Sequence, residues 1–151
     1  MPIANLDDKI TPNFTYRELI RSETGDKLGL DNTPSQDHLL NIIYLAENLQ
    51  KLRDLIKKPI KILSGYRCQE LNKLIGGSEK SQHMVGQAAD IICPGITPLE
   101  LALFIFEKMP YYDQLILEFN IWVHVSFKEN PRKQALSIRD RHEGYTPGIR
   151  Y

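Results

Sequence analysis

Two histidines and one aspartate are spaced so that they could hold a metal ion. His83 and Asp90 lie seven residues apart with Gly86 between them, and His124 lies in the run WVHVS. The first spacing does not suit two ligands on one helix, but it suits a loop histidine that comes to lie beside a strand aspartate. Zinc takes three or four nitrogen, oxygen or sulfur ligands, and a catalytic site leaves one position to water. We therefore expect half of a zinc site within residues 64–90 and the other half at His124.

The residues around Asp90 and His124 support this interpretation. Asp90 lies in the apolar run AADII, where a buried carboxylate without a partner is costly. A metal ion would compensate its charge, and an arginine would do so too. Strand alternation places His124 on the face opposite to its apolar neighbours, so it would face a cleft while they face the core. Taken singly, each histidine is more often an ordinary partly buried residue than a ligand, and it is their combination that favours a site.

Length and charge limit the classes of function. The chain has 151 residues, a common size for one domain with one hydrophobic core. We expect a single domain over residues 1–151, with peripheral segments at 1–13 and 140–151, and we expect a monomer. The 19 lysines and arginines balance the 19 aspartates and glutamates. Because nucleic acids and anionic membranes require a basic surface, we predict no nucleic-acid partner.

The cysteine content and the first residues of the chain indicate the cellular compartment in which the protein is made. Cys68 and Cys93 are too few for a disulfide framework and have no C-x-x-C partner, so we expect free thiols in the core. The start, MPIANLDDKITP, carries acidic residues where a signal peptide needs an apolar run, and no window approaches the length of a membrane span. We expect a protein made in the cytoplasm without a signal peptide and without a membrane partner.

Capping residues and apolar periodicity predict the elements that position the candidate ligands. Segment 23–34 is rich in turn residues and is predicted to be a loop, and the tail at 144–151 is predicted to be extended or loose. Helices precede most of the strands without regular alternation, which predicts an α+β fold with a small, mostly antiparallel sheet flanked by helices. The predicted helices cover 16–22, a long segment between Ser35 and Pro59, 68–75 and 97–108, and the predicted strands cover 60–63, 87–93, 114–119, 122–127 and 134–138.

An ordered set of motifs resembles a known family. S-G-Y-R is followed by L-N, G-G, S-x-H-x-x-G-x-A-x-D and a late W-V-H, over about residues 14–127. This set is similar to that of the zinc D-alanyl-D-alanine carboxypeptidase family, whose fold is shared by the hedgehog signalling domain and by bacteriophage endolysin peptidases. The resemblance is closest to small phage and prophage peptidases that cut peptidoglycan peptides. It implies the hedgehog or DD-peptidase type of α+β fold.

The resemblance assigns roles to particular residues. It makes His83, Asp90 and His124 the zinc ligands. It makes Arg67 the group that faces the substrate carbonyl or the charge developing on it, and it places Ser81 and Gln82 in a substrate-facing loop. An arginine is always charged and can stabilise a tetrahedral oxyanion, which agrees with that role. Separately, the aromatic residues Tyr66, Tyr111, Tyr112 and Trp122 could form a wall for a peptide, although such residues pack in cores at least as often.

The general base is where the sequence departs from the family pattern. Many members keep an acidic residue three positions before the final histidine, and here that position is Ile121, which cannot move a proton. Glu118, six positions before His124, is the replacement, as in hedgehog-type relatives. A three-residue hairpin loop at 119–121 would pair Glu118 with Trp122 and put it on the face of His124, whereas a two-residue loop would point it away. We predict the three-residue loop.

Alternatives remain for these positions. If Glu118 is only a solvated edge residue, Asp113 is the next candidate base, although its place at a strand start suggests a turn residue. His38 lies in the first turn of the long helix and His142 in the polar tail, so both are expected to be solvated.

The resulting hypothesis is a zinc-dependent peptidase that hydrolyses an amide bond in peptidoglycan stem peptides, as a D-Ala-D-Ala carboxypeptidase or an endopeptidase. The substrate class comes from the resemblance, which also implies action on the cell wall after release through a partner holin or in a virion. The rival hypothesis is a non-catalytic zinc-containing module of the same fold that binds cell wall or a protein. A phage virion part used for attachment is a third, which no particular residue supports.

Overall fold

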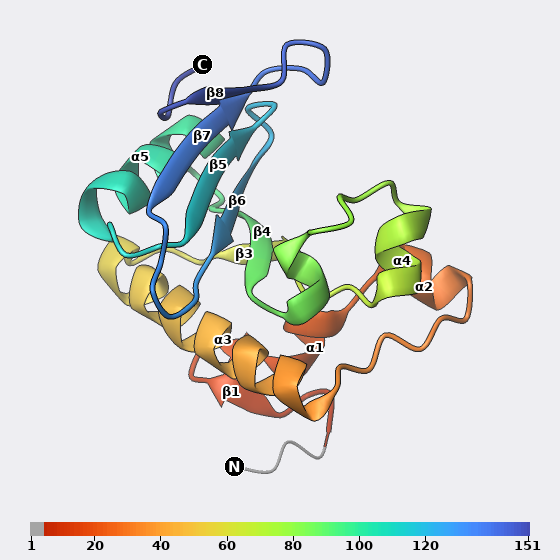
Figure 1. Cartoon of the computed structure of the whole chain (residues 1–151). Coiled ribbons are helices and arrows are strands. Elements are labelled where there is room, and N and C mark those ends of the chain that lie inside the picture. Colours follow the sequence, from red (N-terminus) through yellow and green to blue (C-terminus); the bar gives the residue numbers. More distant parts are fainter. Residues whose placement is uncertain (1–4) are drawn as a thin grey trace.

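The fold is organised by a six-stranded sheet with the strand order β3-β4-β6-β5-β7-β8 (Figure 1). The computed structural model describes residues 5–151, so residues 1–4 of the predicted peripheral segment 1–13 lie outside the described residues. Every neighbouring pair of strands is antiparallel except β5 and β7, which are parallel. The strands are β3 (Lys61–Ser64), β4 (Ala88–Ile92), β5 (Gln114–Glu118), β6 (Trp122–Ser126), β7 (Gln134–Ile138) and β8 (Tyr145–Pro147).

Three helices begin where capping residues predicted them. Thr15 and Glu18 form a reciprocal capping box at the start of α1, and the Ser35 hydroxyl accepts a hydrogen bond from the backbone of the first turn of α3. Thr97 caps α5, which has proline at its first position. The helices are α1 (Tyr16–Ile20), α2 (Glu23–Lys27), α3 (Gln36–Ile56), α4 (Gln69–Leu74), the 3₁₀ helix η1 (Gln82–Val85) and α5 (Pro98–Lys108).

The two faces of the sheet have different environments. Because side chains alternate along a strand, the apolar positions of β4, β5 and β6 point to one face, where they pack with α3 and α5. The opposite face carries the candidate site, and Figure 1 shows α4 and the loop after it on the side of the molecule away from α5. The central core residues are Ala89, Ile91, Leu115, Leu117, Val123 and Val125 of the sheet, Leu45, Leu49 and Leu52 of α3, and Leu101, Ala102 and Ile105 of α5.

This arrangement confirms the predicted α+β class with a mostly antiparallel sheet and flanking helices. Cys93 is buried in the core, Cys68 is partly buried against the core, and both are free thiols. Within residues 5–151, no helix has the length and apolar character needed to span a membrane.

Several short elements were not predicted. β1 (Lys9–Thr11) and β2 (Phe14–Thr15) form a small hairpin, and α2 lies within the predicted loop 23–34. The tail predicted to be extended or loose contributes β8, which pairs with β7. The loop after α2 is fixed by Asn32, whose amide donates to the carbonyls of Ile20 and Tyr66. These elements depend on contacts with distant residues rather than on local periodicity, which explains why sequence patterns missed them.

Candidate metal centre

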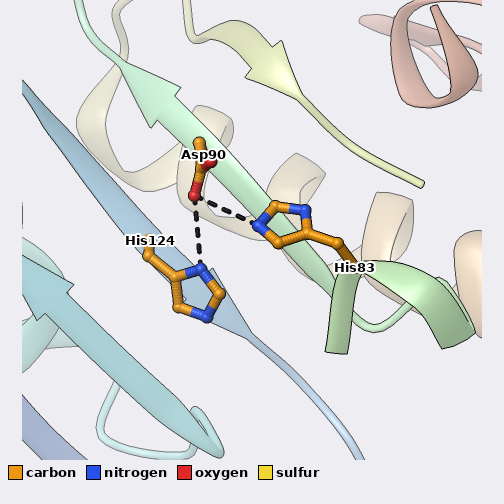
Figure 2. Close-up of side chains that lie close together, drawn as sticks. All are labelled: His83, Asp90 and His124. Atoms are coloured by element: carbon orange, nitrogen blue, oxygen red, sulfur yellow. Dashed lines mark hydrogen bonds and ion pairs between the residues drawn. The ribbon is translucent and has the colours of Figure 1, made fainter. Parts of the chain in front are cut away.

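Three side chains from three separate elements converge on one point of the open face of the sheet. Figure 2 shows His83 of η1, Asp90 of β4 and His124 of β6 directed toward one another. Oδ1 of Asp90 lies 3.3 Å from Nε2 of His83 and 3.2 Å from Nδ1 of His124. The ligand atoms of all three residues lie within 4.8 Å of one another. The spacing of these nitrogen and oxygen atoms fits a single bound cation.

Strand register places two of these residues side by side. Asp90 of β4 pairs directly with His124 of β6, which in turn pairs with Ile116 of β5. Residues directly opposite in an antiparallel ladder have neighbouring Cβ atoms on the same face. The carboxylate and one imidazole are therefore held together by backbone pairing, with no dependence on a flexible loop.

His83 is oriented by the turn that carries it. The Ser81 hydroxyl accepts a hydrogen bond from the His83 backbone at the start of η1. On the ring, Nδ1 lies 2.8 Å from the carbonyl oxygen of Gly65, which requires Nδ1 to be the protonated nitrogen. Nε2 then carries the lone pair and faces Asp90. An imidazole that donates one N–H to a carbonyl while its other nitrogen faces the centre has the arrangement usual for a metal ligand.

The protonation of the group suits a metal ion. Burial lowers the pKa of His83, which favours the neutral imidazole that a metal requires. Burial opposes ionisation of Asp90, but the two imidazoles outweigh it and hold the pKa of the carboxyl well below its usual range. The side chains of His83, Asp90 and His124 are only 2%, 13% and 9% exposed. Two imidazoles and one buried carboxylate form a donor set that fits zinc with an open fourth position.

Glu118 lies beside the three candidate ligands. It pairs with Trp122 across the β5–β6 hairpin, which confirms the predicted three-residue loop at 119–121. The backbone makes this loop by taking positive φ at Phe119 and Asn120, 56° and 52°. Oε1 of Glu118 is 3.9 Å from Nδ1 of His124. Burial and the Asp90 carboxylate raise the pKa of Glu118, as expected for a carboxyl that can accept and return a proton.

Arg67 brings a positive charge to the same face. Its Nη2 donates a hydrogen bond to the Ser81 hydroxyl at 3.3 Å, and its backbone N–H donates to the carbonyl of His83 at 3.0 Å. Nε is buried and has no hydrogen-bond partner among residues 5–151. Burial lowers the pKa of Arg67, while the charges of Asp90 and Glu118 act in the opposite direction. The guanidinium stays charged and retains N–H groups that a ligand could use.

The site opens into a cleft of about 830 Å³. Of the residues predicted to contact substrate, Ser81, Gln82 and Trp122 line this cleft. The expectation for Tyr66 is wrong, because its side chain is buried in the core, with its ring beside that of His38, and does not line the cleft. Tyr111 and Tyr112 do not line it either, and Tyr112 packs in the core. Tyr66 and Tyr112 therefore serve core packing, Tyr111 is exposed away from the cleft, and Trp122 is the one of these four aromatic residues that lines it.

Asp113, the second candidate base, has a different role from the one considered. Its side chain is fully buried, and its carboxylate is ion-paired with Arg132 at 2.7 Å. It therefore has no free oxygen facing the cleft. Sequence reasoning missed Arg132, which lines the cleft together with Lys80, Arg141 and Tyr145. No local pattern links Arg132 to Asp113, because they are 19 residues apart and meet only through the pairing of β7 with β5.

The remaining histidines differ from each other. His142 is exposed, as predicted. His38 was predicted to be solvated, but it is only partly exposed, and its Nδ1 is buried without a partner within the described residues. Its ring lies beside that of Tyr66, tilted by 46°, at 5.7 Å between ring centroids. Neither histidine belongs to the His83, Asp90 and His124 cluster.

Comparison with known proteins identifies a matching family model and a related curated protein. Residues 12–126 match the family model described as Peptidase M15. The zinc D-Ala-D-Ala carboxypeptidase of Streptomyces albus G is 36% identical over 90 residues, which cover 56% of this chain and 33% of that protein. The chain thus spans about a third of the length of the curated relative that it matches.

Proposed function

Since the chain belongs to the peptidase M15 family, we propose that it is a zinc-dependent peptidase which hydrolyses an amide bond in peptidoglycan stem peptides. The reaction would be either release of a terminal D-alanine or cleavage of an internal bond. The zinc D-Ala-D-Ala carboxypeptidase that matches over 90 residues supports this substrate class. Among the structural observations, the position of Glu118 beside the three candidate ligands carries the proposal furthest.

His83, Asp90 and His124 would hold the zinc ion through Nε2, a carboxylate oxygen and Nδ1. When bound, zinc lowers the pKa of a water molecule and polarises the carbonyl of the amide to be cut. Among residues 5–151, no further histidine, cysteine, aspartate or glutamate belongs to this group of ligand atoms. Gly65 supports the arrangement, since its carbonyl holds the His83 ring in the tautomer that leaves Nε2 free.

Glu118 and Arg67 supply the remaining chemistry. Glu118 takes the proton of the attacking water and gives it to the leaving amine, which requires a carboxylate close to the ligands but not one of them. Arg67 donates N–H groups to the oxygen on which negative charge develops, and it lines the same cleft. Because the proposed substrate is a cell-wall polymer, we propose that the protein acts at the wall.

The proposal is tested by digestion of purified peptidoglycan and of synthetic stem peptides with the zinc-loaded chain, with products identified by mass spectrometry. We expect loss of a terminal D-alanine or appearance of an internal fragment. Glu118→Gln should reduce kcat by about 10²- to 10⁴-fold while zinc content stays unchanged. Glu107→Gln is the matched control, because Glu107 is exposed on α5 across the sheet from the cleft. Hydrolysis that persists in Glu118→Gln would remove Glu118 from the mechanism.

One observation favours a second function, a non-catalytic binding module. Ile121 occupies the position where many relatives are expected to keep an acidic residue, and it is 60% exposed at the tip of the hairpin. It cannot take part in proton transfer. If the zinc-loaded chain binds peptidoglycan fragments but releases no product, the binding-module function replaces the peptidase function.

A further inference from the structure

A second charged cluster lies at the edge of the cleft, outside the candidate metal centre. Its centre is Asp113, which directly precedes β5 and whose side chain is 0% exposed. The carboxylate accepts hydrogen bonds from the backbone N–H of Arg132 at 2.8 Å, from its Nε at 3.1 Å and from its Nη2 at 2.7 Å. It also accepts one from Nε2 of Gln82 at 2.9 Å. A buried carboxylate with this many donors stays ionised and holds its partners firmly.

The sheet fixes the position of this cluster. The backbone N–H of Asp113 donates to the carbonyl of Ser126 at 2.8 Å, and the backbone N–H of Gln134 donates to the carbonyl of Asp113 at 3.0 Å. These bonds join the start of β5 to the end of β6 and to the start of β7. The guanidinium of Arg132 is thus attached to a rigid part of the fold, although Arg132 itself lies in a loop.

Gln82 connects the cluster to the candidate metal centre. It is adjacent to His83 in η1, and its side-chain oxygen accepts a bond from Nη2 of Arg132 at 3.4 Å. Both Gln82 and Arg132 line the cleft. The guanidinium therefore stands at a fixed place in the cleft, next to the turn that carries one candidate ligand.

The exposure of Arg132 distinguishes it from a purely structural counter-ion. Its side chain is 50% exposed although its partner is fully buried. The bonds to Asp113 and Gln82 use Nε and Nη2, and Nη1 has no hydrogen-bond partner within residues 5–151. A guanidinium held in this way loses little further freedom when it binds a ligand. Planar carboxylates are ligands that match its geometry.

The charges around Arg132 also favour an anion. An adjoining hollow is lined by Lys80, Lys128 and Arg132, with Glu79 as its one acidic residue. Nζ of Lys128 lies 3.9 Å from the Asp113 carboxylate, which is also paired with Arg132. Two cationic side chains therefore share one buried carboxylate. A substrate carboxylate would be attracted to the Arg132 end of the cleft.

We propose that Arg132 is a specificity-determining residue that binds a carboxylate of the peptide substrate, and that Asp113 and Gln82 are positioning residues that hold its guanidinium in the cleft. This inference rests on the proposed function, since it assumes that a peptide occupies the cleft. It adds a second cation to the substrate contacts, on the segment that follows residues 12–126 matched by the family model.

The test compares peptides that differ only in a carboxylate. The probe is the synthetic peptide L-Ala-γ-D-Glu-L-Lys-D-Ala-D-Ala, together with derivatives in which either the glutamate α-carboxylate or the C-terminal carboxylate is an amide. Hydrolysis is followed with the zinc-loaded chain, and binding is measured by calorimetry in the Glu118→Gln background. The second measurement reports on Arg132 whether or not the chain cleaves peptides.

Arg132→Gln should raise KM and Kd for the free peptide by about 10- to 100-fold, the range for a lost hydrogen bond to a charged group, with kcat changed less than about twofold. One of the amide derivatives should bind wild type and Arg132→Gln equally, and this identifies the carboxylate concerned. Asp113→Asn should reduce the preference for the free carboxylate in the same direction. Lys133→Gln is the control, because it removes the same charge at the next, exposed residue, which does not line the cleft.

Three results would overturn the inference. Arg132→Gln could weaken all peptides equally, which would make the cluster a structural brace. It could also leave every peptide unaffected, or the wild-type chain could bind none of them. If only the proposed peptidase function fails, the result is different. The zinc-loaded wild-type chain would then still bind the free peptide more tightly than one of its amide derivatives, but it would release no product.

Discussion

Oε1 of Glu118 lies 3.9 Å from Nδ1 of His124, on the same face of the β5–β6 hairpin. The relationship follows from the length of one loop. Because the loop at 119–121 has three residues, Glu118 pairs with Trp122, whereas a loop shorter by one residue would turn its carboxylate toward the opposite face. A candidate proton carrier and a candidate metal ligand are thus brought together by hairpin register.

The metal centre is the first feature to test. His124→Ala removes one of three donors, and the remaining pair should hold zinc far more weakly. We expect about one zinc per chain in the wild type and loss of that zinc from the variant, measured by elemental analysis of dialysed protein. His142→Ala, in the exposed tail, should keep its zinc. Zinc retained without His124 would show that the metal binds elsewhere.

Arg67 should affect catalysis more than metal binding. Arg67→Lys keeps the charge but loses the planar set of N–H groups available to a developing oxyanion. We expect kcat to fall by about 10²- to 10³-fold with zinc content unchanged. The control is Arg21→Lys, an exposed arginine at the end of α1. An unchanged kcat would place the oxyanion away from Arg67.

Asp113 should contribute strongly to stability. Asp113→Ala leaves Arg132 without its carboxylate, in a position that is fully buried, and removes one of the two acceptors of the Gln82 amide, the other being Oε1 of Gln87. Since Arg132 is half exposed and can recover some hydration, we expect a loss of about 2 to 3 kcal/mol in the free energy of unfolding. Asp7→Ala breaks an exposed ion pair with Arg17 and should cost less than about 1 kcal/mol. Urea denaturation of the metal-free proteins measures both.

The Asp113 carboxylate should also affect how the free energy of unfolding falls at acid pH. Burial opposes its ionisation, but the bonds and charge of Arg132 outweigh burial and lower the pKa of Asp113 below its ordinary value. Its folded-state pKa is therefore below its unfolded-state pKa, and the folded state binds fewer protons. This contribution is present above the unfolded pKa and is lost as pH falls through the folded pKa. Below about pH 4, Asp113→Asn should lose stability less steeply than the wild type. If the free energy of unfolding of the two proteins fell equally with pH, the lowered pKa of Asp113 would be contradicted.

Gly65 should couple packing to the metal centre. A Cβ at this residue would collide with the backbone carbonyl oxygen of Leu19 in α1. If the backbone shifts to relieve this collision, the Gly65 carbonyl that contacts the His83 ring moves with it. We expect Gly65→Ala to destabilise the fold by about 2 kcal/mol or more and to weaken zinc binding by about 10- to 100-fold, since the His83 ring loses its support. Gly95→Ala is the control, because a Cβ there has no neighbour within 4 Å. Its backbone strain should lower stability, while zinc affinity stays unchanged. Competition with a chelator measures the affinities.

Local signals in the sequence were sufficient for much of the fold. A helix cap involves residues three or four apart, so Thr15, Ser35 and Thr97 could be identified without knowledge of the rest of the chain. The strands β4, β5 and β6 were predictable for the same reason, because short apolar runs and the alternation in WVHVS are local properties. The types of the candidate ligands and the resemblance to zinc peptidases also came from the sequence.

Only the tertiary structure decided which distant side chains meet. The sequence limited the Glu118 loop to two alternatives, and strand pairing selected one of them. It offered Tyr66 as a cleft residue and Asp113 as a base, but packing placed Tyr66 in the core and paired Asp113 with Arg132. The parallel pairing of β7 with β5, which brings Arg132 to Asp113, depends on the burial of many side chains at once. Residue types and local caps are properties of a few neighbouring residues, whereas register and burial are properties of the whole packed chain, and this is why the sequence determined the chemistry available and the fold determined its arrangement.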